Sequence, residues 1–184
     1  MTMKAMLLQG LRVLLVTTGA LLMVASADAQ EKQKISYKIP SGVTQITQRH
    51  VLDVGDVPGH QVTLAEYHSK YTNEAPGPVY GDVKAVEDTR SLQADIINGT
   101  GHVSGYGVFL LENGDKIFAR AEQVLYSTVA PDGARKSSVT AVYALTGGTG
   151  KFKGIRGTLK QTSSTDFKTG LGETVVEGEY WIEN

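Results

Sequence analysis

The sequence predicts an all-β protein, and three observations support that prediction. From Ile35 onward, no apolar periodicity of 3.6 residues is sustained over three turns, so the pattern of an amphipathic helix is missing. Apolar and polar residues alternate instead, between clusters of Gly, Asn, Asp and Pro. Residues 146–157 contain five glycines in twelve positions, which suits a sharp bend from one strand into the next.

The predicted strands follow one another at short spacing. The clearest turn signals are residues 55–59, Asn113-Gly114 and residues 131–133, and Asn-Gly is typical of a two-residue hairpin. About eight strands result, and closing them into a single eight-stranded antiparallel β-barrel would leave no free sheet edge. The expected strands are 43–54, 60–71, 101–112, 116–129, 136–146, 155–165 and 173–182, with short strands at 83–86 and 92–97 around a charged turn.

The first 29 residues have the features of a secretory signal peptide. Lys4 and Arg12 give a basic start, residues 13–24 are an uncharged apolar run, and small residues around Ala27 and Ala29 offer cleavage sites. The apolar run is shorter than the ~20 residues of a membrane span. We therefore expect a secreted or periplasmic protein without a membrane span in its mature form. The expected division is 1–29 signal peptide, 30–42 leader segment and 43–184 β-barrel domain.

Composition narrows the class of protein further. Cleavage after residue 29 leaves 16 basic and 18 acidic residues, a net charge of −2, so we expect no nucleic-acid partner. The chain has no cysteine, which excludes disulfides, a thiol enzyme and a Cys-ligated zinc site. An exported domain of this kind must be held together by its core alone.

The glycine-rich stretch does not match a nucleotide-binding loop. A Walker loop ending at Lys151 needs glycine where the chain has Leu145, and Ser or Thr where it has Phe152. The dinucleotide fingerprint fails because Lys153 occupies the position of its third glycine. We therefore expect a structural hairpin here and no cofactor.

Residues 147–157, with Gly-Gly-Thr-Gly-Lys-Phe followed by Gly154 and Ile-Arg-Gly, resemble the signature hairpin of allene oxide cyclase-like and dirigent-like β-barrels. Residues 98–106 and 112–115 are similar to other parts of that pattern, so the resemblance covers roughly residues 80–184. It implies an eight-stranded barrel with an internal pocket. It also implies two kinds of activity, holding a reactive substrate in one conformation or steering a coupling reaction, but it transfers no catalytic residue.

Glu66 and His68 are the first candidate ligand-binding residues. On an unbroken strand over 60–71 they share one face with Val62 and Leu64, and the two apolar residues predict that this face points into the barrel. A carboxylate and an imidazole two residues apart could share a proton or polarise a ligand.

His60 and Tyr106 complete the candidate ligand-binding set. His60 lies on the same strand face as Glu66 and His68, and Tyr67 lies on the opposite face. The alternative is that all four are ordinary rim or surface residues. No histidine spacing typical of a metal site is present, so we expect no metal, and the catalytic residues stay unknown.

The sequence thus predicts an exported β-barrel that binds a small, largely apolar molecule in its lumen. Two alternatives stay open: a cyclase, isomerase or dirigent-like enzyme that steers a reactive substrate, and a non-catalytic structural or interaction barrel with a filled core. We lean away from an enzyme, and we leave homo-oligomerisation open.

Overall fold

The structure is a computed structural model that describes residues 31–40, 42–131, 133–166 and 171–183. These residues form ten strands and one short 3-10 turn, so the predicted all-β class is confirmed. The elements are β1 (Gln33–Ile39), β2 (Thr44–Asp53), β3 (His60–Lys70), β4 (Val79–Tyr80), β5 (Val83–Ile97), β6 (Thr100–Leu111), β7 (Lys116–Val129), β8 (Arg135–Gly148), η1 (Gly150–Phe152), β9 (Ile155–Asp166) and β10 (Leu171–Ile182).

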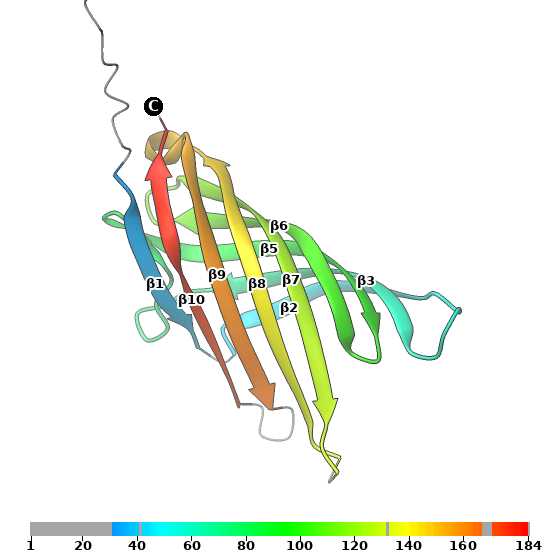
Figure 1. Cartoon of the computed structure of the whole chain (residues 1–184). Helices are drawn as coiled ribbons and strands as arrows, with labels where there is room; N and C mark the ends of the chain where they lie inside the picture. Colours follow the sequence, from blue (N-terminus) through cyan, green and yellow to red (C-terminus); the bar gives the residue numbers. More distant parts are fainter. Residues whose placement is uncertain (1–30, 41, 132, 167–170, 184) are drawn as a thin grey trace, which may run out of the picture.

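All strands belong to one antiparallel sheet with the order β1-β10-β9-β8-β7-β6-β5-β3-β2, and β4 adds to β5. The sheet curls over itself, so that β1 and β10 to β7 form one layer and β6, β5, β3 and β2 cross behind it (Figure 1). Among the described strands β1 does not pair with β2, so the sheet is open and the predicted closed, eight-stranded barrel is not confirmed. Because β1 ends at Ile39 and β2 begins at Thr44, a short connection holds the two sheet edges together at one end.

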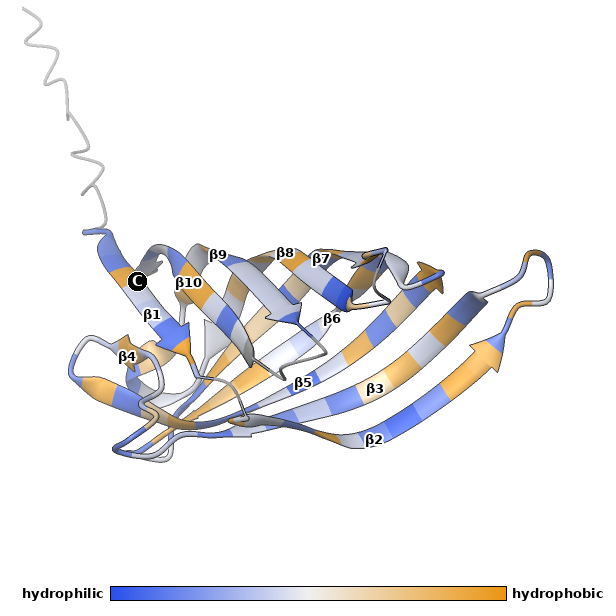
Figure 2. Ribbon diagram, turned by 90° about the horizontal axis from the view of Figure 1, so that it is seen from below, coloured by the Kyte–Doolittle hydropathy of each residue, from blue (hydrophilic) through white to orange (hydrophobic). Residues whose placement is uncertain are grey.

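The core lies on the inner, concave face of the sheet. Inward positions alternate with solvent-facing ones along each strand, as the banding of hydrophilic and hydrophobic residues in Figure 2 shows. One end of the core is an aromatic cluster around Tyr80, whose ring centroid lies 5.9 Å from Phe109, 6.3 Å from Phe152 and 5.3 Å from Tyr180. Fully burying such large side chains stabilises the fold by roughly 1.5–3 kcal/mol each.

β5 is one continuous strand, although the sequence predicted two short strands around a charged turn. It pairs with β3 on one side and with β6 on the other over most of its length. A bulge between Ala85 and Glu87 shifts the alternation, so that Ala85 and Asp88 both face inward. The charged residues therefore lie within the sheet, and two of them, Asp88 and Arg90, point into the interior.

β1 lies within residues 30–42, which we expected to be a leader segment ahead of the barrel domain. Ile35 is buried and Tyr37 and Ile39 pack against the core, while the strand pairs with β10 along its whole length. These three apolar residues alternate with polar ones, which is a strand pattern. Residues 33–39 of the expected leader segment therefore form an edge strand of the sheet.

The glycine-rich stretch forms the predicted sharp bend, and it encloses a carboxylate of the protein itself. The Lys151 backbone N–H donates to Asp115 Oδ2 at 3.3 Å, and the Thr149 hydroxyl approaches Asp115 Oδ1 at 3.5 Å. Gly150 has φ +52°, and a Cβ on it would lie within 2.6 Å of Asp115 Oδ2. Glycine is therefore required here by both backbone conformation and space.

The predicted signal peptide, residues 1–29, lies outside the described residues. In the part of the chain that the structure describes, no helix is long and apolar enough to cross a membrane.

Candidate functional site

A buried ion pair on the inner face of β5 forms the floor of the candidate site. Asp88 is 3% exposed and the Arg90 side chain 14%, and Arg90 Nε lies 2.8 Å from Asp88 Oδ1. The distance defines an ion pair, but neither atom has a well-aligned hydrogen bond, so we treat the contact as electrostatic. Burial alone would lower the pKa of the Arg90 guanidinium, but the Asp88 carboxylate, together with the neighbouring Tyr143 and Tyr71, offsets this and keeps that pKa above its ordinary value.

Three tyrosines surround this pair. Burial raises the pKa of the Tyr37, Tyr71 and Tyr143 phenols, and the Asp88 carboxylate raises all three further. The Tyr71 hydroxyl donates to Asp88 Oδ2. The phenols therefore stay protonated at neutral pH, and those of Tyr71 and Tyr143 donate hydrogen bonds to Asp88 and Gln161.

The wall on the β2 and β3 side is made of hydroxyl groups. Arg90 Nη2 donates to Thr44 Oγ1 at 3.2 Å and to Ser69 Oγ at 3.1 Å, and these two hydroxyls lie 2.9 Å apart. The Arg90 guanidinium carbon also lies 5.8 Å from the centre of the Tyr67 ring. These contacts fix the guanidinium in place, which suits a binding surface.

The opposite wall is a chain of hydrogen bonds across β8, β9 and β10. The Tyr143 hydroxyl donates to Gln161 Oε1 at 3.0 Å, and Gln161 Nε2 donates to Ser163 Oγ at 3.0 Å. Ser163 Oγ lies 2.8 Å from Thr174 Oγ1. This series of hydrogen bonds runs from the ion pair toward the end of the sheet where β1 is followed by β2.

Two hollows lie along these walls. A deep cavity of about 10 Å³ is enclosed by the ion pair, the tyrosines and Ile39, and it has room for about one water molecule. A cleft of about 210 Å³ lies next to it. Ile39 lines both hollows, and the other residues that line the cleft are Pro40, Gly42, Thr44, Thr165, Gly172 and Thr174.

A larger hollow lies elsewhere. It measures about 620 Å³ and lies over β1, β9 and β10, where mostly exposed side chains such as Lys34, Lys160 and Glu177 line it. These long charged side chains are solvated and leave no buried group to satisfy. We therefore place the candidate site at the inner cleft, next to the buried polar groups of the ion pair and its tyrosines.

No metal centre is evident in the described ranges. There, no three His, Cys, Asp or Glu side chains lie close enough to share an ion. Chemically, the inner site offers neutral hydroxyl and phenol groups and one ion pair whose charges cancel, an arrangement that can orient an uncharged polar group.

The structure places Glu66 and His68 on the outer face of β3, so their predicted inward orientation is wrong. Leu64, on the same face, is 57% exposed, whereas Ala65 is buried and Tyr67 packs against the core. The inner face of β3 carries Tyr67 together with the small residues Thr63, Ala65 and Ser69, while the aliphatic Leu64 faces solvent. His68 Nε2 lies 3.2 Å from Glu87 Oε2, and the Thr47 hydroxyl donates to Glu66 Oε1 at 2.7 Å.

His60 and Tyr106 are also separate from the inner cleft. His60 Nδ1 lies 2.6 Å from Asp56 Oδ1 and its Nε2 lies 2.8 Å from Asp95 Oδ1, at the end of the β2–β3 hairpin. Hydrogen bonds to Asp95 and Asp56 raise the pKa of the His60 imidazole. Tyr106 is 67% exposed. The structure thus brings none of the four predicted residues to one pocket, and their ligand-binding role stays a prediction.

Asp88 and Arg90 are the site residues that sequence reasoning missed. A signal was present, since a continuous strand over residues 83–97 puts these two residues on one face. Their charges led us to expect a solvent-exposed turn.

Comparison of the chain with protein-family models, with curated proteins and with solved structures returned no match. The resemblance to allene oxide cyclase-like and dirigent-like barrels stays a prediction based on the glycine-containing motifs.

Proposed function

We propose that the inner face of the sheet binds a small uncharged molecule with an apolar body and one hydroxyl or carbonyl group. One observation carries the proposal: a cleft of about 210 Å³ adjoins the buried Asp88–Arg90 pair and is walled by Thr44 and Thr174. The proposal keeps the predicted binding of a small molecule inside the fold, and it moves the site from β3 to the cleft.

The charges of the site support an uncharged ligand. Asp88 neutralises Arg90, and the surrounding phenols stay protonated because burial raises their pKa. A charged ligand would have to leave water without gaining an unpaired counter-charge, which is costly. The cleft is also smaller than the roughly 300–1,000 Å³ of typical drug-sized ligand sites, so a single-ring molecule fits best.

The second candidate function is a non-catalytic interaction barrel with a filled core. It is favoured by the deep cavity, which at about 10 Å³ leaves no room for a ligand beside the ion pair. We further propose that the curled sheet has the architecture of an allene oxide cyclase-like barrel left open between β1 and β2, and that the protein is exported. The short step from β1 to β2 and the signal-peptide features of residues 1–29 support these two points.

The ligand proposal is tested with three ring compounds that differ in one group: cyclohexanol, cyclohexanone and cyclohexanecarboxylate. Ligand-observed NMR should detect the first two and not the carboxylate. Thr174→Val should weaken binding, because it removes a hydroxyl that lines the cleft. Thr140→Val is the matched control, because Thr140 is exposed on the outer side of β8.

Two results would contradict the proposal. Preferential binding of the carboxylate would show that the site is not electrostatically neutral. If none of the three compounds binds and native mass spectrometry of the protein from its host finds no retained small molecule, the filled-core candidate is favoured instead.

A further inference from the structure

β2 is an unpaired edge of the sheet. It spans Thr44–Asp53, pairs with β3 on one side, and has no neighbour on its other side among the described strands. All of its residues except Thr44 are exposed. Figure 2 shows β2 as the outermost strand of its layer, running out toward the tip of the β2–β3 hairpin.

Exposed aliphatic side chains gather on this edge. Ile46 is 52% exposed, Val51 46% and Leu52 68%, and Val54 and Val57 continue the series beyond the strand. An exposed edge with aliphatic side chains is a template for pairing with another strand. A register shift between Ile46 and Gln48 interrupts the strand, so regular pairing is confined to the half from Gln48 to Asp53.

We propose that this half of β2 pairs antiparallel with β2 of a second copy of the chain, across a two-fold axis at Val51. In that register Arg49 lies opposite Asp53 of the second copy, and the reciprocal pair forms at the same time. Val51 contacts its own symmetry mate between the two ion pairs, because these three residues share one strand face. On the other face, His50 lies opposite Leu52 of the second copy.

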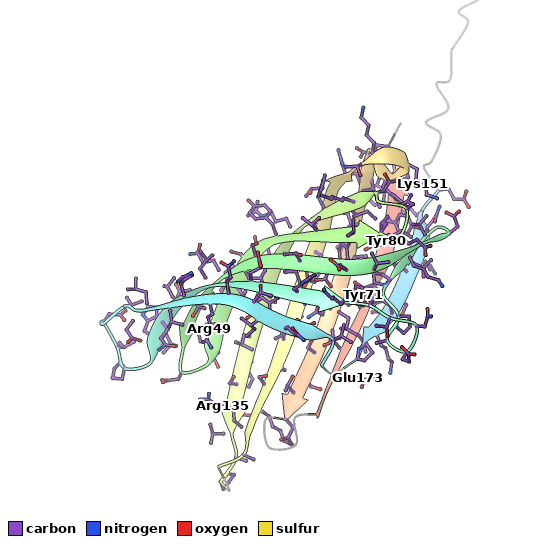
Figure 3. The ribbon with its side chains drawn as sticks, turned by 180° about the vertical axis from the view of Figure 1, so that it is seen from behind. Arg49, Tyr71, Tyr80, Arg135, Lys151 and Glu173 are labelled. Atoms are coloured by element: carbon purple, nitrogen blue, oxygen red, sulfur yellow. The ribbon has the colours of Figure 1, made fainter. Side chains whose placement is uncertain are left out.

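Charge complementarity favours a second copy as the partner. Arg49 makes no ion pair within the described part of the chain, and Figure 3 shows it on β2. Gln61 Nε2 donates to Asp53 Oδ1 at 2.9 Å, which orients that carboxylate and leaves Oδ2 for an incoming guanidinium. The other free edge, β1, carries the lysines Lys34 and Lys38 and lacks this complementarity. A two-fold contact uses the same strand on both copies, so it closes as a dimer and does not propagate through β2.

Disulfide trapping tests the register, because the chain has no cysteine of its own. Val51→Cys places two thiols opposite each other across the two-fold axis. Leu52→Cys is the matched control: that position is more exposed, but it faces His50 of the second copy and not its own mate. Under mild oxidation at equal protein concentration, V51C should form the covalent dimer at least about tenfold faster than L52C. Equal rates would overturn the proposed register.

Charge reversal tests the ion pairs. In sedimentation equilibrium, the unmodified protein should dimerise with rising concentration, and R49D or D53R alone should each weaken the dimer about tenfold, since two pairs become repulsive. An equimolar mixture of R49D and D53R should restore dimerisation, because all four charges are then complementary across the two chains. Circular dichroism melting checks that both variants fold. Two outcomes would overturn the proposal. One is a protein that stays monomeric at millimolar concentration, for example because β1 pairs with β2 of the same chain. The other is a mixture of R49D and D53R that does not regain dimerisation.

Discussion

Replacing Gly150 by alanine should destabilise the protein by about 2.5–4 kcal/mol. The left-handed conformation at φ +52° costs an alanine about 1–2 kcal/mol. The added Cβ would also lie within 2.6 Å of Asp115 Oδ2 and displace that carboxylate from the Lys151 N–H. Losing a hydrogen bond to a charged group adds about 1.5–3 kcal/mol, and we take the lower part of that range because the contact is exposed to solvent.

Urea unfolding of matched variants separates the two causes. Gly114→Ala is the control, because Gly114 has φ +85° but no atom within 4 Å of the added Cβ, so it should lose only the conformational part. In an Asp115→Ala background, Gly150→Ala should also lose only that part. Equal losses for the Gly114 and Gly150 variants would show that displacing Asp115 costs nothing. An unchanged loss for Gly150→Ala in the Asp115→Ala background would show the same. We expect no ATP or NAD binding by any of these proteins.

Two further predictions concern charged groups. Arg90→Leu should lower the free energy of unfolding in urea by about 3–5 kcal/mol, because it leaves Asp88 buried and unpaired. Adding Asp88→Asn to this variant should recover part of the loss. A double variant less stable than Arg90→Leu would argue against the ion pair. His60 has a raised pKa in the folded state, because Asp95 and Asp56 accept hydrogen bonds from its ring, so its stabilising effect should be complete below pH ~6.5 and be lost as pH rises through the folded pKa. The melting temperature of the unmodified protein minus that of His60→Gln should therefore shrink from pH 6 to pH 9; a difference that grows over this range would contradict the assignment.

Alternation and turn signals were sufficient to predict most strands of the sheet. The Asn113-Gly114 turn and the glycine-rich bend lie where the sequence places them, because their backbone requirements are local. The Asn113-Gly114 turn is longer than the expected two-residue hairpin, since the Leu111 N–H donates to the Asp115 carbonyl and, of the two central residues, only Gly114 has a positive φ. The connection of β1 to β10 was missed, although Ile35 and the alternate apolar residues after it form a strand pattern, because the partner strand lies far away in sequence.

The candidate site was harder to predict, because strand periodicity gives two faces without saying which one points inward. Val62 and Leu64 suggested one face of β3, whereas the curved interior accommodates Thr63 and Ala65 of the other. In β5, the charges of Asp88 and Arg90 indicated solvent exposure. They are buried because each supplies the other's counter-charge, a tertiary contact that spacing alone does not reveal.

NMR shift mapping with cyclohexanol shows whether the inner cleft is the binding site. After backbone assignment, a titration should shift the amide signals of Thr44, Thr165 and Thr174, which line the cleft, and the same titration of Thr174→Val should shift them less. Shifts confined to Lys34, Lys160 and the rest of the outer hollow, with the cleft threonines unchanged, would contradict the account.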